Sequence, residues 1–412
     1  MRIGVDATCL ANRRGYGRQA RSLLRAAAEL DRRNHYVYFA DSSEASANLP
    51  PGSDVRQVRT SAPAVEAARS NGRRSVADLW RMSRAMASPD LDCLLFPTVY
   101  SYVPVFSRAS KVVIIHDVIP EKLPAQVFPT ALGRFYWGMK SAAARRQADL
   151  ILTVSEYSRR ALAEHFGEPM ERIQVVGEAA DPVFRVLENP TLSERLLRLG
   201  LSPDQRLLVF VGGFSPHKNL LELLEVFAAI ADRPACGDLR LVLIGDQQRD
   251  AFHSCYRQVE YRAAQPPLQG RVVLAGFVPD EELVGLLNLA TALVLPSRLE
   301  GFGLPAIEAA ACGLPVVATI ASPLPELLGE GALYVDPSDT ASLRWALERV
   351  LTDADLRQRL RDHGLRAAAA LSWSNAAKEL LSIFDQISVT RQPLSQLPQP
   401  PLSAPRPPAP GP

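Results

Sequence analysis

Short apolar runs recur along the chain, and segments with helical spacing of apolar residues lie between several of them. Strands that are buried on both faces of a parallel sheet are continuously apolar, and helices connect them. A stretch punctuated with Ser, Pro and Asp follows Pro190, and after it the pattern starts again. The sequence therefore predicts an α/β protein with two Rossmann-like halves. The expected strands are Ile3–Val5, Tyr36–Phe39, Cys93–Phe96, Val112–Ile115, Leu150–Val154, Ile173–Val176, Leu207–Val211, Leu239–Ile244, Val272–Leu274, Ala292–Leu295, Val316–Ala318 and Ala332–Val335.

This pattern and one change in composition divide the chain into four regions. We expect a first Rossmann-like domain at residues 1–190 and a second at residues 203–371. One last helix is expected at 372–387, where it could pack back on the first domain. Nine of the twenty residues from Pro393 to Pro412 are proline, which neither helices nor sheets accommodate. Residues 388–412 are therefore expected to form an extended, disordered tail.

Composition excludes several classes of protein. The 412 residues are 47% hydrophobic and 22% charged, which is typical of a folded globular protein. The 46 Lys and Arg residues against 44 Asp and Glu residues give a formal charge of +2, too balanced for a protein that mainly wraps nucleic acid. The five cysteines are scattered and form no C-x-x-C pair, which predicts buried thiols in a reducing compartment.

Charge is unevenly distributed along the chain. Residues 1–185 hold 26 basic and 19 acidic residues, and the remainder holds 20 and 25. No apolar stretch approaches the roughly 20 residues of a membrane span, which predicts a cytoplasmic protein or one bound peripherally at the inner face of the cytoplasmic membrane. Two interpretations of the basic first half stay open: contact with an anionic membrane, or solvated helix faces beside core aromatic residues. The most suggestive cluster is Phe135, Tyr136, Trp137, Lys140, Arg145 and Arg146.

The most informative segment follows the expected strand Ala292–Leu295. A strand that opens into a helix is where α/β folds bind ligands, and Gly301 and Gly303 let the backbone approach a bound group closely. The free N–H groups at the start of that helix suit a diphosphate. Glu308 lies one turn inside an otherwise apolar helix, where an unpaired carboxylate is costly, so it requires hydroxyl or cationic partners. A purely structural role at the helix terminus is the alternative.

A second strand also opens into a helix, at Val211–Leu220. Only five of the 46 basic residues are lysine, so Lys218 in this loop is less expected by chance than an arginine. An exposed lysine near a helix start is the alternative interpretation.

Two further candidates lie in the first half. His116 and Asp117 follow an apolar strand and are either a substrate-binding pair or a capping pair. Gly15 and Gly17 belong to a G-x-G-x-x-A stretch, which admits a dinucleotide site with Asp41 as the ribose ligand. However, these glycines begin nine residues beyond the first strand's Asp6, and that spacing favours a loop that contacts a donor phosphate or an acceptor instead.

Glu300 and Glu308 form an E-x7-E pair around Gly-Phe-Gly-Leu-Pro, and Ala311–Val317 continues the match. This segment closely resembles the retaining glycosyltransferases of family 4, which have the GT-B fold. The resemblance implies that Glu300 contacts the donor sugar and that Glu308 holds the ribose hydroxyls. It also implies that the backbone at Phe302, Gly303 and Leu304 contacts the donor.

The resemblance extends to three other segments. The loop with Lys218 looks like the phosphate loop of the family, in which the lysine holds the donor diphosphate. Gly213 of that loop stands where the family often has an arginine, so a basic residue from elsewhere is expected to complete the charge clamp. Thr153–Arg159 resembles the T-x-S-x-x-S stretch, with Ser155 as a helix cap. Val176–Pro182 departs from the V-x-N-G-I-D signature, and no contact is carried over to it.

The resemblance implies a catalytic function. His116-Asp117-x-x-Pro120 is similar to a stretch of a bacterial subgroup that often uses GDP-mannose. We therefore expect retaining transfer of a hexose, with mannose favoured, from a nucleotide sugar to a saccharide or lipid-linked saccharide in cell-surface polysaccharide synthesis. His116, Lys218 and Glu300 are the expected catalytic residues, with no metal and no cofactor besides the donor. A sugar-nucleotide epimerase or a binding protein on the same scaffold, and an NAD(P)-dependent oxidoreductase, stay open as alternatives.

Overall fold

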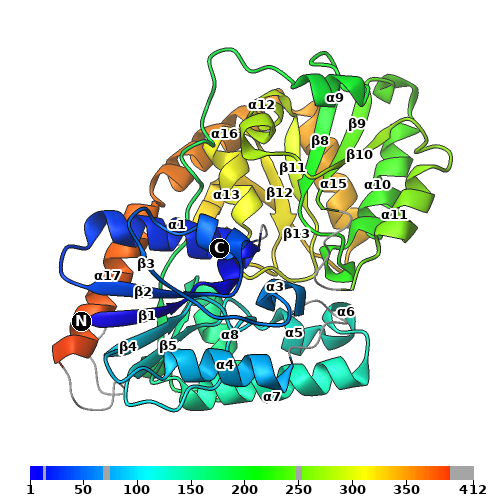
Figure 1. Ribbon diagram of the computed structural model, residues 1–412. Helices are drawn as coiled ribbons and strands as arrows, with labels where there is room; N and C mark the ends of the chain where they lie inside the picture. The colour runs from blue at the N-terminus through cyan, green and yellow to red at the C-terminus, as the bar shows by residue number, and fades with distance from the viewer. Residues whose placement is uncertain (13–14, 68–74, 247–252, 390–412) are drawn as a thin grey trace.

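The computed structural model describes residues 1–12, 15–67, 75–246 and 253–389. The chain forms two α/β halves, each built on its own parallel sheet (Figure 1). The predicted α/β fold with two Rossmann-like sheets is therefore confirmed. Within the described residues, no helix combines the length and the apolar character that crossing a bilayer requires. Residues 390–412, which make up most of the predicted tail, lie outside the described part of the chain.

The first half has a seven-stranded sheet in the order β3-β2-β1-β4-β5-β6-β7. Successive residues of its central strands point to opposite faces, as the pleat requires. In β4, Cys93 and Leu95 enter one buried cluster, whereas Leu94 and Phe96 enter the cluster on the other face. The strands are β1 (Arg2–Asp6), β2 (His35–Ala40), β3 (Asp54–Gln57), β4 (Cys93–Phe96), β5 (Ser110–Ile114), β6 (Leu150–Thr153) and β7 (Ile173–Val175).

Helices cover both faces of this sheet. α1 (Gly15–Leu30) packs on one face, and α4 (Val76–Met86), α7 (Ala131–Gln147) and α8 (Glu156–Phe166) pack on the other. α8 begins at Ser155, whose side chain accepts a hydrogen bond of 3.0 Å from the Ser158 amide, which confirms the predicted cap. The shorter helices are α2 (Ser43–Ala47), α3 (Ala64–Ala67), α5 (Ile119–Lys122) and α6 (Pro124–Val127), with 3-10 turns η1 (Thr8–Ala11) and η2 (Met170–Arg172).

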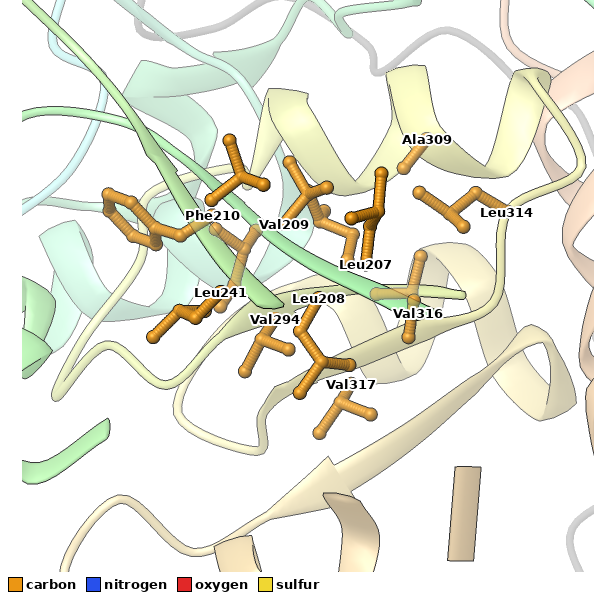
Figure 2. Packing of buried hydrophobic residues seen from close by; sticks show 14 of the residues in the cluster. Leu207, Leu208, Val209, Phe210, Leu241, Val294, Ala309, Leu314, Val316 and Val317 are labelled. Atoms are coloured by element: carbon orange, nitrogen blue, oxygen red, sulfur yellow. The ribbon is translucent and has the colours of Figure 1, made fainter. Parts of the chain in front are cut away.

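The second half has a six-stranded parallel sheet in the order β10-β9-β8-β11-β12-β13. Its central strands are almost continuously apolar, apart from Arg206 in β8, Arg240 in β9 and Thr319 in β12, because helices cover both faces. Figure 2 shows side chains of β8, β9, β11 and β12 in one buried cluster with Ala309 of a covering helix. The strands are β8 (Arg206–Val211), β9 (Leu239–Ile244), β10 (Val272–Gly276), β11 (Ala292–Leu295), β12 (Val316–Thr319) and β13 (Ala332–Val335).

The helices of the second half follow the same alternation. They are α9 (Glu194–Arg198), α10 (Leu220–Ala231), α11 (Tyr256–Ala263), α12 (Asp280–Leu289), α13 (Leu304–Ala311), α14 (Leu324–Leu328), α15 (Thr340–Thr352) and α16 (Ala354–Ala369), with 3-10 turns η3 (Pro216–Lys218), η4 (Pro234–Cys236) and η5 (Gly329–Gly331). α17 (Trp373–Val389) then returns to the first half, where it packs along α1 (Figure 1).

The two halves touch through a small apolar cluster. Ile119, Val127 and Phe128 of the first half pack with Leu299 of the second. An ion pair between Arg160 of α8 and Glu326 of α14 adds a polar contact between the halves. The carboxyl ends of β5 and β11 lead into the segments that carry this cluster. These contacts therefore lie beside the place where parallel sheets present ligand-binding loops.

Candidate active site

The loop between β11 and α13 has a backbone that only glycine suits at Gly303. This residue caps α13 with a φ of 87°, and a Cβ there would lie 2.9 Å from the Leu324 side chain. The side chains of Phe302 and Leu304 are buried in the core of the second half. Only their backbone groups are left to contact a ligand at the start of α13.

Glu300 and Lys218 form the central ion pair of the site. Lys218 Nζ lies 2.7 Å from Glu300 Oε1, which also accepts a 2.6 Å hydrogen bond from Ser297 Oγ. Burial alone would raise the pKa of Glu300, but the Lys218 ammonium and these hydrogen bonds hold it below its usual value. Glu300 is therefore ionised, and its carboxylate holds the half-buried Lys218 in place at the centre of the site.

Glu308 has a different environment, although it belongs to the same motif. It is buried in α13, and its Oε1 lies 3.3 Å from Arg18 of α1, across the boundary between the halves. Arg18 also lies 2.5 Å from Asp280 of α12. Burial raises the pKa of Glu308 to about 8, because Arg18 offsets only part of the desolvation cost. Oε1 has no hydrogen-bond partner within the described residues, so it is available to a hydroxyl group.

Gly301 is the point where the two halves approach most closely in this loop. A Cβ at Gly301 would lie 2.5 Å from Asp117 Oδ2, and Ser158 Oγ donates a 3.0 Å hydrogen bond to the Gly301 carbonyl. Asp117 is in turn an electrostatic neighbour of Glu300 and Lys218. Glycine at this position therefore lets the first half close against the loop that carries Glu300.

His116 presents an imidazole with both ring nitrogens buried and without a hydrogen-bond partner in the described part of the chain. Burial lowers the pKa of His116 to about 4, so the ring is neutral at physiological pH. A neutral ring can donate one hydrogen bond and accept another but carries no charge. The unpaired ring nitrogens favour the substrate-binding interpretation of His116, with hydrogen bonds to a sugar, over the capping interpretation.

Glu178 is a buried cleft residue that the sequence analysis did not select. It follows β7, and its electrostatic neighbours are Asp117 and Glu308. Burial raises the pKa of Glu178 to about 8, and those two carboxyl groups raise it further. The signal that could have identified Glu178 is the departure itself, since an acidic residue replaces the amide in the V-x-N-G-I-D signature.

The predicted glycines occupy distinct positions. Gly17 lies in the first turn of α1, where a Cβ would clash with the Asn12 carbonyl at 2.1 Å, whereas Gly15 is exposed. Gly213 lies between β8 and η3. Asp41 Oδ2 accepts a 2.6 Å hydrogen bond from the Ala64 amide, which commits one of its oxygens to a structural contact. This contact weakens the dinucleotide interpretation of the glycine loop.

The structure brings the predicted residues into two groups. Lys218, Glu300 and the backbone of Gly301 lie together and face Asp117. Glu308 lies with Arg18, the cation that the first half contributes beside it. Beside the turn with Lys218, a cavity of about 300 Å³ is lined by Asn219, Arg298 and Gln126 of the first half, among others. Lys218, Glu300 and Glu308 do not line this cavity.

Two models of known protein families match the chain. Residues 19–183 match Glycosyltransferase Family 4, and residues 197–366 match Glycosyl transferases group 1. The O-antigen chain mannosyltransferase B of Escherichia coli is 30% identical over 237 residues, which are 58% of this chain and 60% of that protein. A serotype-specific mannosyltransferase of Escherichia coli is 25% identical over 283 residues, which are 68% of this chain and 34% of that protein. The match therefore spans less than two thirds of the length of either relative.

A solved structure agrees with these matches at the level of the fold. Sucrose-phosphate synthase from Thermosynechococcus elongatus superposes with a TM-score of 0.72 at 20% identity, covering 94% of this chain and 99% of that one. Together the two family models cover both halves of the chain, including the loops that carry Lys218, Glu300 and Glu308. The chain belongs to the GT-B glycosyltransferases of group 1 and family 4.

Proposed function

We propose that this chain transfers a hexosyl group from a nucleotide sugar to a saccharide acceptor with retention of the anomeric configuration. The observation that carries the proposal is the ion pair in which Nζ of the half-buried Lys218 lies 2.7 Å from Oε1 of the buried Glu300, at the boundary between the halves. A half-buried lysine that is paired with one carboxylate can bind the diphosphate of a donor without moving far. The family membership of the chain supports the same reaction class.

Each residue has a role that follows from its chemistry. Lys218 and the amides at the start of α13 would stabilise the negative charge that develops on the departing diphosphate. Glu300 and His116 would orient the sugar by accepting and donating hydrogen bonds, and Glu308 would hold the ribose diol. The bond from the anomeric carbon to the phosphate oxygen breaks while the bond to the acceptor oxygen forms on the same face. The acceptor proton then passes to the departing diphosphate.

We further propose GDP-mannose as the donor and a lipid-linked saccharide at the inner face of the cytoplasmic membrane as the acceptor, in the synthesis of a cell-surface polysaccharide. The H-D-x-x-P stretch at His116 and the similarity to mannosyltransferases support the donor. The excess of basic residues in the first half supports an acceptor that is carried by an anionic surface.

Thermal denaturation with GDP, UDP, ADP, their sugar conjugates and NADH tests the proposal. A ligand at a hundred times its Kd adds about 2.7 kcal/mol of stability, which shifts the melting temperature measurably. We expect GDP and GDP-mannose to raise Tm. The anomeric configuration of the product, read by NMR, then tests retention. Stabilisation by NADH alone would overturn the proposal, and conversion of the donor without an acceptor would favour an epimerase.

A further inference from the structure

One face of α7 exposes a continuous apolar stripe. Leu132, Phe135, Tyr136 and Met139, which we call the α7 stripe, follow the i, i+3, i+4, i+7 spacing of one helix face. Each of the four is between 44 and 60% exposed. Large apolar side chains gathered on one exposed face mark an interaction surface rather than a solvated helix.

α4 extends the same surface. Its Met82 and Met86 pack into the buried cluster that also holds Ala144 and Ala148 of the α7 segment, so both helices cover the same face of the sheet. Figure 1 draws α4 and α7 together at the lower edge of the first half. Outside, α4 presents Trp80, which is 59% exposed. Amphipathic aromatic rings of this kind favour the boundary between water and lipid.

The charge of α7 limits the partners that fit this surface. The helix carries Arg134, Lys140, Arg145 and Arg146 and no acidic residue. Arg145 pairs with Glu168, whereas Arg146 is exposed at the surface. A helix with apolar and aromatic residues on one face and only basic charges suits an anionic bilayer surface, where each basic residue near the surface contributes about 1 kcal/mol.

The opposite side of α7 faces the active-site cleft. Trp137 packs against the apolar cluster between the halves, and its Nε1 donates a 2.7 Å hydrogen bond to Glu121. Glu121 is an electrostatic neighbour of Asp117, which lies against Gly301. The α7 stripe is therefore about one helix diameter, roughly 10–12 Å, from the cleft. A surface bound there would hold membrane-anchored acceptors close to the site.

We propose that the α7 stripe, together with Trp80 of α4, docks the chain on an anionic membrane surface and places the cleft beside lipid-linked acceptors. The identity of the acceptor rests on the proposed function, whereas the docking itself does not. The apolar residues enter the headgroup region, and the exposed Arg146 meets an anionic lipid headgroup, whereas Lys140 donates to the Tyr100 carbonyl and Arg145 pairs with Glu168.

Flotation with vesicles tests the docking. The full chain is mixed either with phosphatidylcholine vesicles or with vesicles that also contain about 30% phosphatidylglycerol, each at low and at high salt. We expect binding to the anionic vesicles that weakens with salt. The double variant Phe135→Ser/Met139→Ser should bind at least tenfold more weakly. The matched control Tyr261→Ser/Trp345→Ser, which alters exposed side chains of α11 and α15, should bind like the parent chain.

Two further readouts keep the outcomes separate. GDP should raise Tm of Phe135→Ser/Met139→Ser as it does for the parent chain, which shows that the fold and the donor site persist. Equal vesicle binding by all variants, or none by the parent chain at low salt, would overturn the docking. A dimer of the parent chain, seen in light scattering and abolished by Phe135→Ser/Met139→Ser, would also overturn the docking, because the α7 stripe would then contact a second copy of the chain. A chain that binds vesicles but no nucleotide would contradict the proposed function alone.

Discussion

The two ends of the E-x7-E segment are equally buried but differ in what stabilises their charge. Glu300 has its cation, Lys218, and its hydroxyl donor, Ser297, within its own half of the chain. Glu308 has its cation, Arg18, in the other half, and at the longer distance of 3.3 Å. As a result, the pKa of Glu300 is lowered, whereas the pKa of Glu308 rises to about 8.

This difference shows that burial does not determine the charge of a carboxyl group without its partners. At the Glu300 end, the ion pair is complete within one half and does not depend on how the halves meet. At the Glu308 end, the charge depends on a contact between the halves, so closing or opening the cleft changes it. We infer that the Glu300 end is preorganised and that the Glu308 end responds to the bound donor.

Lys218→Ala should have the largest effect because it removes the cation of the preorganised end. We expect kcat/KM to fall by about 100- to 1,000-fold, since charge on the departing diphosphate is no longer stabilised. Steady-state kinetics with the donor found by thermal denaturation measures this. Lys378→Ala, which changes an exposed lysine of α17, is the control. A value of kcat/KM within threefold of the parent chain would remove Lys218 from the site.

Glu308→Ala should have the next largest effect, and it should appear in nucleotide affinity. Loss of the hydrogen bonds between the Glu308 carboxyl group and a ribose diol, each worth about 0.5–1.5 kcal/mol, should weaken GDP binding by about 5- to 100-fold. Calorimetric titration with GDP and 2′-deoxy-GDP checks the assignment, because the variant should discriminate less between them. Glu330→Ala, an exposed residue, serves as the control. Undiminished discrimination would place the ribose elsewhere.

The sequence predicted the second half of the site better than the first. Lys218, Glu300 and Glu308 lie in the turn, loop and helix that follow directly after apolar strands, so strand periodicity and local motifs located them. The strands themselves were found except for β3, an edge strand whose sequence Asp-Val-Arg-Gln carries no apolar run. Arg18 and Glu178 reach the cleft through long-range folding, and nothing local to either residue reveals the carboxyl groups that face it.

Arg18→Gln should have a smaller effect and separates the two ends of the site. It removes the cation nearest Glu308, so the pKa of Glu308 should rise further and GDP affinity should fall by about three- to tenfold. The contribution of Lys218 and Glu300 to kcat should stay the same in Arg18→Gln as in the parent chain. Arg25→Gln, an exposed residue of the same helix, is the control. A large loss of kcat with unchanged GDP affinity would contradict the assignment of Arg18 to the nucleotide end.

Glu178→Gln should have the smallest effect and should appear in the pH dependence of stability. The pKa of Glu178 is raised to about 8 in the folded protein, so the folded state binds more protons than the unfolded state between about pH 4.5 and pH 8. The free energy of unfolding therefore decreases as pH rises through this range. The glutamine variant lacks the titrating group, so its unfolding free energy should decrease less, by about 2–3 kcal/mol between pH 6 and pH 9.

Urea denaturation of the parent chain and of Glu178→Gln at several pH values measures this difference. Part of the decrease of unfolding free energy with pH should persist in Glu178→Gln, because Glu308 also has a raised pKa. In Glu178→Gln/Glu308→Gln the free energy of unfolding should depend on pH even less. Glu171→Gln, which changes an exposed residue nearby, should keep the slope of the parent chain. If the unfolding free energy of Glu178→Gln has the same pH dependence as that of the parent chain, Glu178 is ionised in the folded protein. The cleft would then hold that negative charge when the donor diphosphate enters.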